Sequence, residues 1–212
     1  MAALEDRLTA DERANLSRLT SPFLIQAYLD QISYNGEDRN RSPLGVIREQ
    51  QGHCLDGGLL GAALLRRLGH PPLVLEMWPE PGLDDDHVLA VYRLDGHWGA
   101  VAKSNYANLR FREPVFRTLR ELVMSYFEDF FNAEGQKTLR SYSLPLDLRR
   151  YAAQDWEVEE SSVDRIEKQL HRLRKYPVLT ERQRANLSLV DERALRAGMV
   201  GTDPQGLYKK KG

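Results

Sequence analysis

Apolar residues recur at helical spacing near the start of the chain. In residues 22–32, Ile25, Leu29 and Ile32 lie three or four positions apart, which predicts a helix with one buried face. Residue pairs that commonly start helices precede three segments: Thr9-x-x-Glu12, Ser21-Pro22 and Ser42-Pro43. Two helices are therefore expected before the polar loop at 35–41, and a short helical segment is expected after it.

The pattern changes from helix to strand in the middle of the chain. Residues 54–68 predict a helix, because Gly69 and then Pro71-Pro72 follow as stop signals. Residues 73–77 form a short apolar run that is typical of a strand. One helix followed by strands indicates an α+β fold, in which this helix packs on a small antiparallel sheet.

A hairpin is predicted around Asp95-Gly96, which is a strong signal for a two-residue turn. Its strands are expected at 87–93 and 97–103. In this register Leu94 pairs with His97, and His87 lies opposite Ser104.

The last third of the chain is expected to be mainly helical. A wide apolar face predicts a helix over 119–131, preceded by Thr118-x-x-Glu121. Residues 141–153 are expected to be irregular. Two further helices are expected to close the chain, the second capped by Thr180-x-x-Gln183, and the tail from Gly201 is expected to be frayed.

The chain has 212 residues, of which 42% are hydrophobic and 29% charged, a composition typical of globular proteins. No Gly/Ser or Pro-rich linker divides it. One domain is therefore expected over 1–212, with a core at 43–105 and flanking helices at 1–42 and 118–205.

Charge and hydropathy exclude several classes of partner. The net charge is -1, from 30 basic and 31 acidic residues, which gives no reason to expect a nucleic-acid partner. No apolar run approaches the ~18 residues of a membrane helix, and the acidic N-terminus does not resemble a secretory signal. Because the only cysteine is Cys54, no internal disulfide can form, and a cytoplasmic location is expected. No cofactor or metal is expected, since no Cys/His spacing resembles a zinc module.

Cys54 is the first candidate for chemistry, because it begins a predicted helix. Unpaired N–H groups and the helix dipole favour a thiolate there, and the thiolate is the nucleophilic form of cysteine. The alternative is a small buried apolar residue, which is a common role for free cysteine.

Three glycines share the helix face of Cys54: Gly57, Gly58 and Gly61. Each costs about 1 kcal/mol relative to alanine, so the close approach of another backbone is expected to compensate. We expect the hairpin face that carries His87, Ala100 and Ala102 to pack there, which would bring His87 towards Cys54. A polar residue at the strand edge is the alternative role for this histidine.

The segments QQGHCLDGGLLGAALLRRLGHPP and DDDHVLAVYRLDGHWGAVAKSN resemble the transglutaminase-like branch of the papain-like cysteine protease superfamily. The residues that match its pattern, in order, are Cys54, Leu64-Leu65-Arg66, Gly69, His87 and Trp98. The resemblance covers residues 43–105 and implies a papain-like fold. It also implies a thiol-dependent amide or ester hydrolase, or an acyltransferase, with Cys54 as nucleophile and His87 as proton carrier. The implied partner is a peptide or other amide-containing substrate, or a protein.

One position departs from that family pattern. The family has an aspartate about four positions after the tryptophan, where this chain has Ala102. A methyl group cannot accept the imidazole N–H or stabilise an imidazolium. Ser104, opposite His87, and Asn105 are therefore the candidate third residues. The alternative is a catalytically inactive interaction domain that keeps the fold.

Other polar groups are weaker candidates. Asp84, Asp85, Asp86 and His87 could ligate a metal, although a solvated loop is the more common role for such a cluster. Arg110, Arg112, Arg117 and Arg120 could bind an anion, but pairing with Glu113 and Glu121 is the more common role. Gln50 and Gln51 could supply an oxyanion donor beside the Cys54 N–H, or could simply be exposed polar residues.

Overall fold

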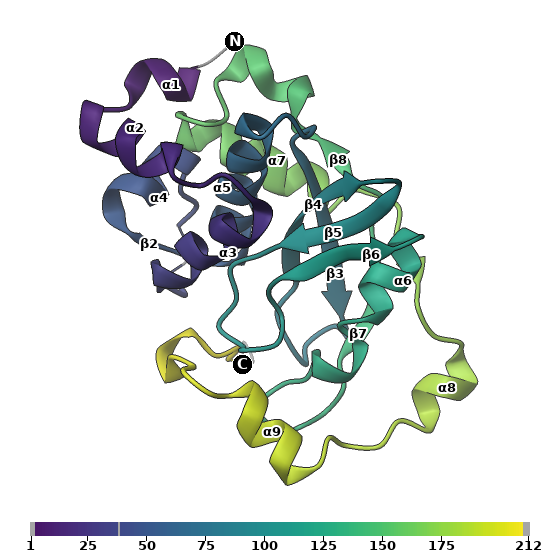
Figure 1. Ribbon diagram of the computed structural model, residues 1–212. Coiled ribbons are helices and arrows are strands. Elements are labelled where there is room, and N and C mark those ends of the chain that lie inside the picture. Colours follow the sequence, from purple (N-terminus) through teal and green to yellow (C-terminus); the bar gives the residue numbers. More distant parts are fainter. Residues whose placement is uncertain (1–2, 38, 210–212) are drawn as a thin grey trace.

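The computed structural model describes residues 3–37 and 39–209. A seven-stranded antiparallel sheet runs through the protein in the order β6-β5-β4-β3-β7-β9, with β8 also pairing with β3, and helices cover both of its faces (Figure 1). The mixed content confirms the α+β class. The strands of this sheet are β3 (Leu73–Pro79), β4 (His87–Leu94), β5 (His97–Val101), β6 (Arg112–Phe116), β7 (Leu139–Tyr142), β8 (Leu146–Asp147) and β9 (Tyr176–Pro177).

Five of the helices begin where the sequence signals predict. Thr9, Ser21, Ser42, Thr118 and Thr180 each accept a backbone N–H of the turn that follows. The α-helices are α1 (Ala3–Arg7), α2 (Ala10–Ser17), α3 (Pro22–Gln31), α4 (Pro43–Glu49), α5 (Cys54–Arg67), α6 (Leu119–Met124), α7 (Glu160–Leu170), α8 (Glu181–Ala185) and α9 (Glu192–Gly198). No helix of the described ranges 3–37 and 39–209 combines the length and apolarity needed to cross a membrane.

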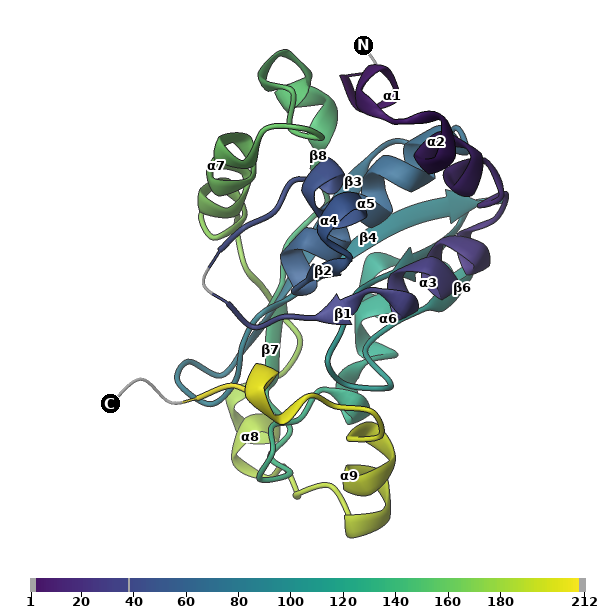
Figure 2. The same ribbon diagram turned by 90° about the vertical axis from the view of Figure 1, so that its left-hand side faces the viewer.

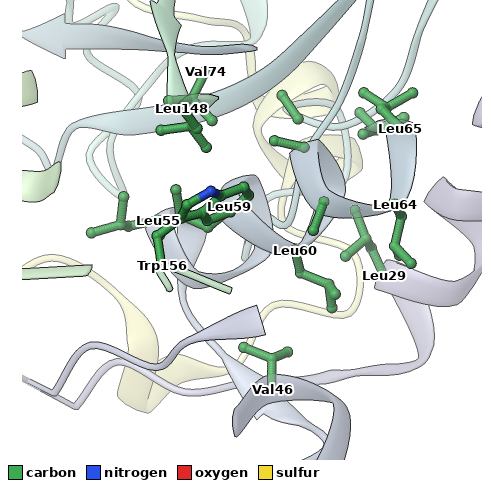
Figure 3. Close-up of a cluster of buried hydrophobic side chains, with 14 of the residues drawn as sticks. Leu29, Val46, Leu55, Leu59, Leu60, Leu64, Leu65, Val74, Leu148 and Trp156 are labelled. Carbon is green, nitrogen blue, oxygen red and sulfur yellow. The ribbon is translucent and has the colours of Figure 1, made fainter. Parts of the chain in front are cut away.

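Two apolar clusters sandwich the sheet. On one face α5 is almost fully buried among α3, α4, α7 and Trp156 (Figures 2 and 3). Its leucines project between these elements, which fixes the helix against the strands. On the other face α6 and the residues after it cover Leu89, Val91, Ala100 and Ala102.

The face of the sheet that meets the glycines of α5 is the opposite of the predicted one. A Cβ on Gly58 would lie 2.7 Å from Val88 Cγ1, and one on Gly61 would lie 2.9 Å from Val101 Cγ2. The glycines therefore allow close packing, as expected, but against Val88 and Val101 rather than Ala100 and Ala102. Alternate strand residues point to opposite faces, so this one-residue difference also puts the His87 side chain on the face away from α5.

The hairpin register is confirmed. Leu94 pairs with His97, and Asp95 and Gly96 both have positive φ, 48° and 82°. The strand pairing ends at Ala90 and Val101, earlier than expected. Beyond it, the Gln26 side chain donates to Ala102 O and accepts from Ala102 N, both at 2.9 Å, and so satisfies the backbone of this residue as a neighbouring strand would.

The C-terminal third differs most from the expectation. The helix predicted to reach residue 131 ends at Met124 and is followed by a single 3-10 turn, η1 (Phe127–Asp129). Strands β7 and β8 and the 3-10 helix η2 (Leu148–Gln154) occupy the segment expected to be irregular, so 118–205 supplies strands as well as helices. Helix α9 was not predicted, because it has few apolar residues and its buried positions depend on distant partners.

Candidate active site

The first turn of α5 is held by a buried carboxylate. Asp56 accepts the backbone N–H of His53 at 3.2 Å and that of Arg41 at 2.7 Å. The Arg41 guanidinium is itself buried and pairs with Glu49 at 2.8 Å. The turn that carries Cys54 is therefore fixed from both sides.

The thiol of Cys54 lies against the start of β4. Its Sγ donates to the carbonyl oxygen of Asp86 at 3.6 Å, and Val88 N also acts on the thiol as a backbone donor. These two groups flank His87 along the chain. The partly buried sulfur thus takes the place beside β4 that β5 leaves when it ends at Val101.

His87 is the first residue of β4, and its side chain is 4% exposed. Its Nε2 lies 2.8 Å from the carbonyl oxygen of Leu109. The ring packs edge-on against Phe130, with centroids 6.4 Å apart. One ring nitrogen and one ring edge are therefore occupied, which fixes the orientation of the imidazole.

Cys54 and His87 line the same cavity, whose volume is about 40 Å³. Tyr34, Ser104 and Asn105 also line it. Among the described residues, no hydrogen bond joins the thiol directly to the imidazole. Helix α5 and the His87 side chain lie on opposite faces of the sheet. Cys54 and His87 nevertheless line one cavity, because this cavity lies at the end of the sheet.

Burial sets the protonation of both groups. It raises the pKa of the Cys54 thiol well above its ordinary value, and the negative charge of Asp86 adds to this effect. Burial also lowers the pKa of His87 to about 4. Both side chains are therefore neutral near pH 7, contrary to the thiolate expected from the helix position alone.

Neither expected third residue is hydrogen-bonded to the His87 ring. Ser104 Oγ accepts the backbone N–H of Tyr106, and the Asn105 side chain bonds to the backbone of Asp203. Ala102 lies in the apolar cluster on the His87 face. The orienting acceptor is the Leu109 carbonyl, which sequence reasoning missed because any residue type can supply it.

Gly206 and Tyr208 of the C-terminal segment line this cavity. The segment lies beside the loop that follows β5 (Figure 1). Asn105 donates to Asp203 O and accepts from Asp203 N, both at 2.9 Å. The backbone of Gly206, in η3 (Pro204–Gly206), lies so close to the Tyr34 ring that a Cβ there would be 2.6 Å from it. The expectation of a frayed tail is therefore wrong for residues 201–209, whereas residues 210–212 lie outside the described chain.

Tyr34 was also missed. It belongs to the short strand β1 (Ser33–Tyr34), which pairs in parallel with β2 (Gln51–Gly52) just before Cys54. Burial raises the pKa of Tyr34 well above its usual range, and the neighbouring Cys54 contributes to the shift. A phenol that faces the thiol is a candidate hydrogen-bond donor for the site.

Most of the other candidates from the sequence have structural partners. Gln50 bonds to Tyr28 and Ile47, and Gln51 bonds to Asn35 and Glu49, so neither amide is directed at Cys54. The arginines at 110, 112 and 120 pair with Asp30, Asp129 and the Val178 carbonyl.

The possible metal ligands also differ from the expected set at 84–87. Asp84 is hydrogen-bonded to Thr138, and burial raises its pKa to about 6. The described side chains that could together hold an ion are Glu76, Asp86 and His171.

No protein-family model matches the sequence, and no curated protein matches it. Among solved structures, LapG of Legionella pneumophila is similar, with 11% sequence identity and a TM-score of 0.44, over 77% of this chain and 93% of that chain. The EGTA-treated form of Legionella pneumophila LapG is similar over 77% and 94% of the two chains, with 13% identity and a TM-score of 0.42. The candidate site therefore rests on the residues of this chain.

Proposed function

We propose that this protein is a thiol-dependent hydrolase or acyltransferase of the transglutaminase-like, papain-like type, acting on an amide or ester carbonyl. The observation that carries the proposal is the placement of Cys54. Its sulfur lies at the first turn of α5, against the two residues that flank His87, and both side chains line one cavity.

The proposed reaction begins with an uncharged Cys54 thiol and an uncharged His87 imidazole. Cys54 attacks the substrate carbonyl while its thiol proton passes to His87, so that a C–S bond forms as the S–H bond breaks. His87 then returns the proton to the leaving amine or alcohol, which leaves a thioester on Cys54. Water or an amine attacks this thioester, and the thiol is restored.

The Leu109 carbonyl supplies the orienting contact in this scheme. A carbonyl oxygen accepts the Nε2 proton and so leaves Nδ1 without a proton, as the nitrogen that can act as base. A neutral carbonyl stabilises an imidazolium less than a carboxylate does. The proposed reaction is therefore slower than that of a site with an acidic third residue.

A peptide is the substrate class best supported by the contacts at the cavity. The Asn105 side chain already binds the N–H and C=O of one residue of the C-terminal segment, as a side chain that recognises peptide backbone would. The same segment brings its own backbone to the cavity that holds Cys54. A substrate peptide would take this place after the segment moves aside.

A catalytically inactive interaction domain is the second candidate function. It is favoured by the size of the cavity, about 40 Å³, which leaves room for only a few water molecules at the roughly 10–15 Å³ that each one needs. The ring hydrogen bond that the described residues show for His87, to the neutral Leu109 carbonyl, is consistent with it.

Formation of an acyl-enzyme distinguishes the proposed hydrolase or acyltransferase from the inactive interaction domain. We would incubate the full chain with p-nitrophenyl acetate and measure nitrophenol release together with the intact mass. Because Cys54 is the only cysteine, a single acetyl adduct that is absent in Cys54→Ser identifies the nucleophile. A catalytic pair predicts that His87→Gln slows acylation by about 100-fold or more. Equal rates in wild type and His87→Gln, or no adduct, would favour the interaction domain.

A further inference from the structure

Two carboxylates and a histidine converge beside the candidate site. Glu76 comes from the middle of β3, Asp86 directly precedes β4, and His171 follows the last residue of α7. His171 Nε2 lies 3.3 Å from Glu76 Oε1 and 3.1 Å from Asp86 Oδ2. One potential ligand atom from each residue lies within 4.8 Å of the others. Three separate elements thus direct polar atoms to one point.

One oxygen of the Glu76 carboxylate is unsatisfied. The side chain is 1% exposed, and within residues 3–37 and 39–209 its Oε2 has no hydrogen-bond partner, whereas its Oε1 lies 3.3 Å from His171 Nε2. A buried carboxylate oxygen without a donor is costly and rare, and a bound cation is one of the few ways to compensate its charge. This orphaned oxygen points to a cation independently of the clustering of the three residues.

We propose that Glu76, Asp86 and His171 bind a divalent transition-metal ion such as Zn²⁺ or Mn²⁺. With bonds of about 2.1 Å, two ligands of a tetrahedral ion lie about 3.4 Å apart, close to the two distances from His171. The imidazole favours a transition metal, because Ca²⁺ and Mg²⁺ prefer all-oxygen ligand sets. With three protein ligands, a fourth position remains for water.

Some charges near the three residues favour a bound cation and others oppose it. Glu167 acts on His171 as a further negative charge. Lys175, whose Nζ lies 4.5 Å from the centre of the Trp78 ring, acts on Glu76 and opposes a cation. The charges of Glu167 and Lys175 cancel. A divalent ion then balances the two negative charges of Glu76 and Asp86, which leaves the site close to neutral.

A shared proton is the rival interpretation. Burial, together with Asp86, raises the pKa of Glu76 well above its ordinary value, so that without a metal the two carboxyl groups would share one proton. In that case Glu76→Gln would keep the hydrogen bond to Asp86, and the protein would show no specific response to metal ions.

The test is metal binding in the Cys54→Ser protein, where the thiol cannot compete for the ion and the proposed catalysis plays no part. After treatment with EDTA and desalting, calorimetry and thermal unfolding would be followed with ZnCl₂, MnCl₂, CaCl₂ and MgCl₂. We expect one Zn²⁺ or Mn²⁺ per chain and a rise in Tm that grows with metal concentration. Glu76→Gln and His171→Ala should each weaken binding by more than about tenfold.

His97→Ala is the matched control, because it removes a histidine far from the cluster that could bind zinc weakly at the surface. It should bind as tightly as its parent. The proposal is overturned if neither Zn²⁺ nor Mn²⁺ binds, if only Ca²⁺ or Mg²⁺ raises Tm, or if Glu76→Gln binds like His97→Ala. Because the Cys54→Ser background lacks the nucleophile, none of these results depends on whether the chain is an enzyme.

Discussion

The imidazole Nε2 of His87 lies 2.8 Å from the carbonyl oxygen of Leu109. A carbonyl only accepts hydrogen bonds, so Nε2 carries the proton of the neutral ring and Nδ1 does not. The backbone thus sets the tautomer that a cysteine–histidine pair needs. No side-chain substitution can delete this acceptor, so the environment of the His87 ring has to be tested through the side chains around it.

Phe130→Leu should raise the pKa of His87. The phenyl ring helps to exclude water from the imidazole, and burial is the main cause of the lowered pKa of about 4. Replacing the phenyl ring by the smaller leucine should let water reach the imidazole edge. The pKa of His87 should then move towards its unfolded value of about 6.5. The measurement is an NMR titration of His87 in EDTA. Phe131→Leu, which alters a buried phenylalanine packed on Tyr106, should leave the titration unchanged.

The same lowered pKa predicts the acid sensitivity of the fold. Between about pH 6.5 and pH 4 the unfolded chain binds a proton at His87 that the folded chain does not. The free energy of unfolding should therefore fall as the pH drops through this window. His87→Gln should flatten this part of the urea-denaturation profile, and an unchanged slope in that variant would contradict the assignment.

Alkylation of Cys54 should be slow at neutral pH. Burial and the Asp86 charge raise the pKa of the thiol, so the thiolate fraction at pH 7 is smaller in the folded chain than in the unfolded one. Iodoacetamide rates between pH 6 and pH 11 would show this, with the same chain in urea as the reference. A folded protein that reacts as fast as the urea-unfolded chain at pH 7 would contradict the neutral pair.

Asn105→Ala should make Cys54 more reactive. The substitution removes two hydrogen bonds that hold the segment around Asp203 over the cavity, each contributing about 0.5–1.5 kcal/mol. We expect alkylation to accelerate by about fivefold or more. Asn186→Ala, at an exposed asparagine after α8, is the control for a general loss of stability. Equal rates in both variants would show that the segment does not shield the thiol.

Gly57→Ala should destabilise the protein although alanine favours helices. Its new Cβ would collide with Lys103 Cβ and lie 3.3 Å from Lys103 Cα, and such overpacking costs about 1–3 kcal/mol. Gly45→Ala in α4 is the matched control, because its Cβ would meet only ordinary contacts at 3.5 Å or more. That variant should be neutral or more stable by up to about 1 kcal/mol. Urea denaturation of both variants measures the difference.

The C-terminal segment shows why distant contacts escape sequence reasoning. Residues 201–209 contain few apolar residues, a composition that predicts a frayed tail. Their order comes from Asn105 and Tyr34, which lie about 100 or more positions earlier in the chain. Hydrogen bonds from a side chain to a backbone group leave no pattern in the segment that receives them.

Local signals in the sequence determined the starts of the helices capped by serine or threonine, the Asp95-Gly96 hairpin with its register, and the position of Cys54 at the first residue of α5. Each depends on contacts within a few residues, which the sequence itself encodes. The tertiary structure alone decided which sheet face meets α5, and so turned the His87 side chain towards Phe130 and Leu109. It also brought together Glu76, Asp86 and His171. Strand alternation leaves the choice of face to the packing of both layers, because a shift of one residue exchanges every side chain between them.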